Sequence, residues 1–128
     1  MPINNTVNKD QKIIYTICTG IMKPEDFDLY INTIWTSSEY FGFNELFDTI
    51  EADWDEFDFS YLLKIAETAS KLDTIDPRSK LAWVVLKGKQ KELTDFYKAA
   101  KSVKNTPSRS LEAFYSKEEA LDWLNKRE

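Results

Sequence analysis

The chain has 128 residues, of which 42% are hydrophobic and 14% aromatic, and it contains no histidine. This length supports one core but not two domains, so we predict a single domain spanning residues 1–128. Without histidine, Ser-His and Cys-His catalytic groups and the usual zinc sites are excluded. Catalysis would have to rest on carboxylates, lysines or tyrosines, and we expect a protein that is not an enzyme and needs no cofactor or metal.

Composition also disfavours membrane, secreted and nucleic-acid-binding roles. No apolar run approaches the roughly 20 residues needed to cross a bilayer. The N-terminus lacks the order of a signal peptide, so we expect a soluble, cytoplasmic protein that is not an integral membrane protein. The net charge of −5 argues against nucleic acid as a partner. Cys18 is the only cysteine, which excludes an intrachain disulfide.

The charges are distributed unevenly along the chain. Residues 25–76 contain 14 acidic and 2 basic side chains, whereas residues 78–109 contain 9 basic and 2 acidic ones. One interpretation is that each segment solvates its own helices. The other is that the fold presents one acidic and one basic surface, which favours head-to-tail association, such as a homodimer, or an anionic ligand.

The first third of the chain predicts a hairpin followed by a helix. Residues 3–7 predict a short first strand, and a polar turn at 8–11 separates it from the more apolar run 13–18, which is typical of two antiparallel strands. Pro24, followed by Glu25 and Asp26, has the composition of a helix start. The apolar residues of this helix recur at the spacing of one helical face: Phe27, Tyr30, Ile31, Ile34 and Trp35.

The remaining chain alternates strands and helices. Residues 46–50 predict a strand, and residues 59–72 a helix whose apolar face is Phe59, Leu62, Leu63, Ala66, Ala69 and Leu72. The unbroken apolar run 81–86 predicts a strand covered on both faces. A helix over 89–103, a strand over 111–115 and a helix opened by a Ser116–Glu119 capping box follow. The order β-β-α-β-α-β-α-β-α predicts an α/β fold with a mostly parallel central sheet of about five strands, covered by about four helices.

The loop between the strand at 46–50 and the next helix is the predicted ligand-binding region. In such folds ligands approach beyond the carboxyl ends of the strands, which points to residues 53–60. This region is rich in aromatic residues, and we expect Trp54, Phe57, Phe59 and Tyr61, with Tyr30 and Trp35 of the preceding helix, to line a pocket or groove. The same aromatic residues could instead belong to the core.

The polar side chains near this region also have more than one possible role. Asp53, Asp55 and Asp58 offer oxygen ligands for calcium, although their spacing does not match a calcium-binding loop. The hydroxyl of Ser60 can cap the helix. Lys87, Lys89 and Lys91 precede or open a helix and could bind a phosphate or an acidic head group, or remain solvated.

Four stretches are distinctive: Thr19-Gly20 followed by Pro24-Glu25-Asp26-Phe27, Asp58-Phe59-Ser60, VVLKGKQKELTDF at 84–96 and FYSKEEALDWL at 114–124. Together with the order of elements, they resemble the STAS domain, the sulphate-transporter and anti-sigma-factor-antagonist family. The closer resemblance is to its SpoIIAA-like branch of small stand-alone bacterial proteins, which are similar to CRAL-TRIO lipid-binding modules. The resemblance implies a module that carries an apolar or lipid-like small molecule or, alternatively, antagonises a regulatory protein. In anti-sigma antagonists a serine at the start of the corresponding helix is phosphorylated, and Ser60 stands nearest to it. Phe59 and Tyr61 stand where that family has a serine and a glycine.

Overall fold

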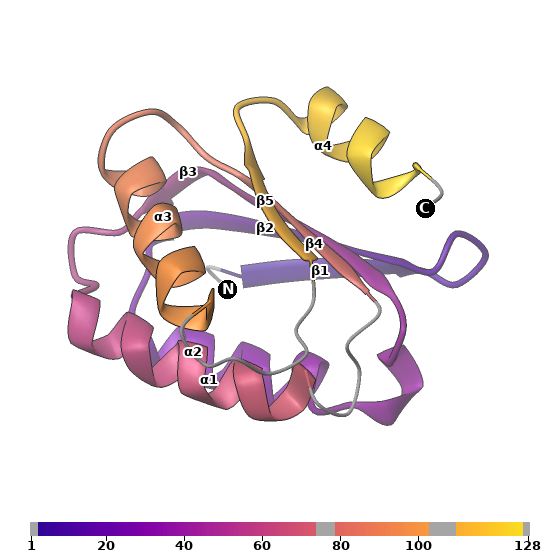
Figure 1. The fold of residues 1–128 in the computed structure, drawn as a ribbon, viewed down its shortest axis with the longest axis horizontal. Coiled ribbons are helices and arrows are strands. Elements are labelled where there is room, and N and C mark those ends of the chain that lie inside the picture. Colours follow the sequence, from indigo (N-terminus) through magenta and orange to yellow (C-terminus); the bar gives the residue numbers. More distant parts are fainter. Residues whose placement is uncertain (1–2, 74–78, 103–109, 127–128) are drawn as a thin grey trace.

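The computed structural model describes residues 3–73, 79–102 and 110–126, which contain one five-stranded sheet in the order β1-β2-β3-β4-β5 (Figure 1). Strand β1 (Ile3–Asn8) pairs antiparallel with β2 (Ile13–Ile21). The remaining pairs are parallel and add β3 (Asn44–Asp53), β4 (Lys80–Val84) and β5 (Ser110–Phe114). The predicted α/β class and the predicted order of elements are confirmed.

The helices lie on both faces of the sheet. Figure 1 shows α1 (Pro24–Tyr30), α2 (Phe59–Asp73) and α3 (Lys89–Ser102) on one side of it and α4 (Lys117–Leu124) on the other. Each parallel strand is added beside the previous one in the same direction, so right-handed crossovers place the three connecting helices on the same face. No helix in the described part of the chain has the length and apolar character needed to cross a membrane.

Two apolar clusters hold these layers together. The larger one lies between the sheet and α1, α2 and α3, and its aromatic members are Phe27, Tyr30, Phe47, Trp54, Phe57, Trp83 and Tyr97. The smaller one lies under α4 and consists of Leu46, Ala82, Val84, Ala120 and Leu124. Every residue of β4 is buried, which confirms the prediction of a strand covered on both faces.

The first helix does not continue as a regular α-helix. Pro24 occupies the first turn, as predicted, and Asp26 accepts a hydrogen bond from the Lys23 backbone N–H (3.1 Å). After Tyr30 the chain forms a π-helical turn, η1 (Ile31–Trp35), and then a short 3₁₀ turn, η2 (Ser38–Tyr40). The Thr36 N–H accordingly donates to the carbonyl of Ile31, five residues earlier (3.2 Å). Trp35 ends this wider turn and is therefore rotated from the place that a regular helix would give it.

The buried face of α2 differs from the predicted one. Leu62, Ile65, Ala66 and Ala69 face the core, whereas Phe59 and Leu63 are 50% and 47% exposed. The prediction that Phe59 and Leu63 belong to the core face was wrong, because two apolar stripes overlap on this helix and the sheet covers only one. Phe59 contacts Phe96 of α3, with ring centroids 4.5 Å apart.

Candidate functional site

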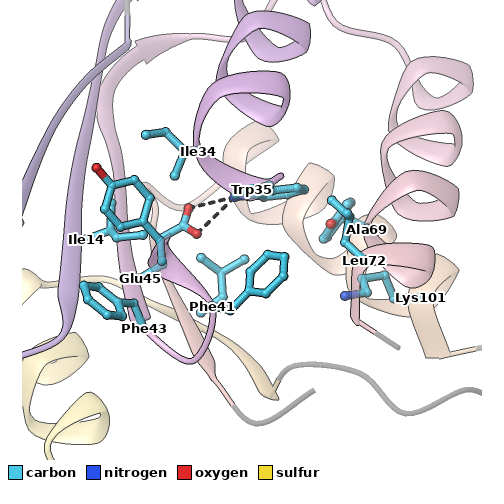
Figure 2. Close-up of a pocket in the computed structure, with 12 residues that line it drawn as sticks. Ile14, Ile34, Trp35, Phe41, Phe43, Glu45, Ala69, Leu72 and Lys101 are labelled. Carbon is cyan, nitrogen blue, oxygen red and sulfur yellow. Dashed lines mark hydrogen bonds between the residues drawn. The ribbon is translucent and has the colours of Figure 1, made fainter. Parts of the chain in front are cut away.

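A pocket lies at the amino-terminal ends of β2, β3 and β4, where these strands meet η1, η2, α2 and α3 (Figure 2). Its cavity volume is about 40 Å³. Aromatic side chains form much of its wall: Trp35, Tyr40, Phe41, Phe43 and Tyr97. Aliphatic side chains complete the wall: Ile14, Ile34, Ala69, Leu72 and Leu81. Glu45 and Lys101 supply the charged groups of the lining.

Glu45 is the most unusual member of the lining, because it is a carboxylate only 1% exposed. It is the second residue of β3, and side chains alternate along a strand, so it shares a face with Phe47. That face is the one covered by α1, α2 and α3. The position of Glu45 in the strand therefore requires its burial.

Hydrogen bonds replace the water that Glu45 loses on burial. The Trp35 indole Nε1–H lies 3.0 Å from Oε1 and 3.2 Å from Oε2, as Figure 2 shows with dashed lines. The Tyr30 hydroxyl donates to Oε2 (2.5 Å) and is itself 2.8 Å from the hydroxyl of Thr16 on β2. A buried charge without such partners costs several kcal/mol, so the three side chains around it are part of one structural unit. We call Thr16, Tyr30, Trp35 and Glu45 the Glu45 cluster.

The π-helical turn brings the cluster together. Tyr30 closes α1 and Trp35 closes η1, and their rings meet edge to face with centroids 6.1 Å apart. Thr16 and Glu45 approach from the neighbouring strands β2 and β3. The cluster thus joins a helix to the sheet at the wall of the pocket.

A second, apolar cavity of about 10 Å³ lies deeper in the core. It shares Trp35, Leu81 and Tyr97 with the first pocket. This volume is about the space that one water molecule needs. Trp35 therefore stands between the pocket and the interior.

One of the six aromatic residues predicted to bind a ligand lines this pocket. Trp35 lines both cavities, whereas Tyr30 lines neither and instead donates a hydrogen bond to Glu45 in the wall. Trp54 and Phe57 are 4% and 5% exposed and belong to the larger core cluster. Their rings pack against each other with centroids 4.8 Å apart.

Phe59 and Tyr61 lie outside both cavities. Phe59 is exposed, whereas Tyr61 is half-buried and its hydroxyl lies 2.7 Å from the Pro24 carbonyl and 2.5 Å from Asp28 Oδ1. Burial, followed by the hydrogen bond to Asp28, raises the pKa of Tyr61. Tyr61 therefore ties α2 to α1.

The acidic loop uses its side chains locally. Asp53 accepts a hydrogen bond from the Asp55 N–H (2.9 Å), and Asp55 forms an ion pair with Lys89 (3.3 Å). Asp58 accepts from the Tyr61 N–H (2.8 Å) and so caps α2, in place of the predicted Ser60. Among the described residues, no group of three carboxylates or thiols is placed to hold a metal ion.

The remaining predicted residues lie on the surface. Ser60 is exposed in the first turn of α2. The Lys87 ammonium lies 5.5 Å from the centre of the Tyr115 ring, Lys89 pairs with Asp55, and Lys91 pairs with Asp95. The three lysines therefore point to separate partners, and the structure does not gather them around one point.

Glu45 is one of several pocket residues that the sequence did not predict as site residues, and the others include Tyr40, Phe41, Phe43, Tyr97 and Lys101. A glutamate at the start of a strand resembles a solvent-exposed end. The available signal was its spacing of two from Phe47, which places the two side chains on the same face of the strand. No protein-family model matches the chain, and no curated protein matches it.

Proposed function

We propose that this protein is a non-enzymatic binding module of the SpoIIAA-like STAS type that takes a small, largely apolar ligand group into the pocket beside Glu45. The observation that carries the proposal is the pocket itself, which has aromatic and aliphatic walls and one buried carboxylate. Ligand sites in proteins combine mostly apolar walls with a few fixed polar groups. The confirmed order of strands and helices is the arrangement that the resemblance implies.

The environment of the reactive groups supports binding in preference to catalysis. Both carboxylate oxygens of Glu45 accept hydrogen bonds from Tyr30 and Trp35, which hold the carboxylate in one orientation as a preformed part of the pocket wall. Cys18 is fully buried, and this burial raises the pKa of its thiol, which disfavours the nucleophilic thiolate.

The volume of the pocket limits what can enter it. A single water needs about 10–15 Å³ of such volume, so 40 Å³ accommodates a group of a few heavy atoms. A long acyl chain would require α2 or η1 to move away from the sheet. We therefore propose that a small head or terminal group of the ligand occupies the pocket.

Native mass spectrometry tests this function. We expect protein purified from cells to carry a small molecule that dissociates on denaturation. Ala69→Leu fills the pocket from α2 and should remove the bound mass. Ala99→Leu makes the same change at an exposed position of α3 and should retain it. A wild-type protein found only at its bare mass, or equal ligand occupancy in both variants, would contradict the proposal.

A further inference from the structure

We infer that the group bound in this pocket is a small organic cation, such as an ammonium carrying alkyl substituents. This inference rests on the proposed function and names the chemical class of the ligand. Two properties of the lining support it independently: the negative charge of Glu45 and the aromatic side chains that surround it.

The charge of the wall gives the first argument. Glu45 is held in place by Tyr30 and Trp35, so its carboxylate is oriented before any ligand arrives. At 1% exposure it is shielded from bulk water, and electrostatic interactions are stronger in such an environment than in solvent. A cation at the wall is therefore attracted, whereas a carboxylate or phosphate at the same place is repelled.

The aromatic side chains give the second argument. Trp35, Tyr40, Phe41 and Phe43 line the same cavity as Glu45. Aromatic rings attract cations through their electron-rich faces, and alkylated ammonium groups gain further from apolar contact. An alkylammonium group matches both the apolar surface and the charge of this wall. Its few heavy atoms also suit a cavity of about 40 Å³.

Lys101 fixes the direction in which a ligand lies. It extends from α3 to the side of the pocket away from Glu45, with Leu72 beside it (Figure 2). Its positive charge opposes a cation at that end. The ammonium group is therefore expected at Glu45, and Lys101 lowers the affinity for it.

Binding of three probes of matched shape tests the inference. Choline carries a trimethylammonium group, 3,3-dimethylbutan-1-ol is its uncharged carbon isostere, and 3,3-dimethylbutanoate is an anion of similar shape. Titrations followed by the indole N–H resonance of Trp35 in NMR spectra should show choline binding about tenfold more tightly than the alcohol. The anion should bind more weakly still. Equal binding of choline and the alcohol would overturn the inference that the ligand is a cation, but it would leave the proposed small-molecule function intact.

Two substitutions, one that removes a negative charge and one that removes a positive charge, sharpen the test. Glu45→Gln removes the charge with little change of shape and should weaken choline about tenfold more than it weakens the alcohol. Lys101→Met removes the opposing charge and should strengthen choline. Thermal unfolding establishes that each variant folds, and Lys101→Met carries the test if Glu45→Gln does not fold. Unchanged choline affinity in Lys101→Met, tighter binding of the anion, or no probe binding at millimolar concentration would overturn the inference.

Discussion

At the residue scale, the start of α2 has two side chains that could cap the helix, Asp58 and Ser60, and the sequence alone does not distinguish them. Asp58 accepts a hydrogen bond from the Tyr61 N–H, and Ser60 lies exposed one residue inside the helix start. Asp58→Ala leaves a helix N–H without its cap and should lower the free energy of unfolding by about 1 kcal/mol. Urea denaturation measures the change. Ser60→Ala is the matched control and should lie within about 0.5 kcal/mol of wild type, so a larger effect at Ser60 than at Asp58 would contradict this assignment.

The same scale shows why the site was only partly predictable. The loop at 53–60 holds more aromatic residues than one strand and one helix need, which suggested a pocket there. Trp54 and Phe57 instead fill a core that also includes Phe27, Phe47 and Trp83, residues distant in the sequence. Whether an aromatic side chain lines a pocket or fills a core depends on these long-range contacts, which a pattern along the chain does not contain.

At the element scale, the π-helical turn η1 determines where Trp35 lies. A π-helical turn has one residue more than an α-helical turn, and each residue of an α-helix advances about 100° around the axis. Deleting the exposed Asn32 should restore a regular helix and rotate Trp35 away from Glu45. The carboxylate then loses a donor, and the free energy of unfolding should fall by about 1–3 kcal/mol.

Asn32→Ala is the control for this deletion, because it keeps the length of the turn and changes only an exposed side chain. It should change stability by less than about 0.5 kcal/mol. Urea denaturation and the Trp35 indole resonance distinguish the two variants. A deletion variant with the wild-type Trp35 resonance would show that η1 does not position this side chain.

Periodicity predicted the elements better than their irregularities. Pro24 and the Ser116–Glu119 capping box marked two helix starts correctly, and the Glu119 N–H lies 3.2 Å from the Ser116 hydroxyl. These signals act within one turn of the chain, so the local sequence contains them. In the wider turn at η1 a backbone hydrogen bond spans five residues instead of four. The side chains that stabilise this region, Glu45 and Thr16, come from other elements.

At the scale of the whole molecule, the pocket lies at the opposite ends of the strands from those predicted to bind a ligand. The general preference for the carboxyl ends of parallel strands pointed to residues 53–60. The pocket instead uses the amino-terminal ends of β2 and β3, where η1 and η2 leave space between the first helix and the sheet. The alternation of strands and helices predicted the layers, but it does not distinguish a pocket at the amino-terminal ends of the strands from one at their carboxyl ends. The sizes of the side chains that different elements bring to each end decide where the cavity forms.

The burial of Cys18 makes the free energy of unfolding of the whole protein depend on pH in the alkaline range. Burial, with smaller contributions from the carboxylates of Asp48, Glu45 and Asp26, raises the pKa of the thiol in the folded state. The unfolded chain releases this proton near pH 8.5, whereas the folded state retains it. The stabilisation is therefore complete below that pH and declines as the pH rises toward the folded-state pKa, so unfolding should cost about 1.4 kcal/mol less at pH 9.5 than at pH 7.5.

Urea denaturation of wild type and Cys18→Ala at the two pH values measures this dependence. The variant lacks the thiol, so its stability should stay nearly constant over the interval, whatever the substitution costs at pH 7.5. Tyr61 changes stability in the same direction, because its pKa is also raised, but an unfolded phenol titrates near pH 10 and contributes little at pH 9.5. A wild-type protein equally stable at both pH values would mean that the thiol ionises as readily in the folded state as in the unfolded chain. An equal decline in Cys18→Ala would assign the pH dependence to other groups, because the thiol is the one titrating side chain that this variant removes.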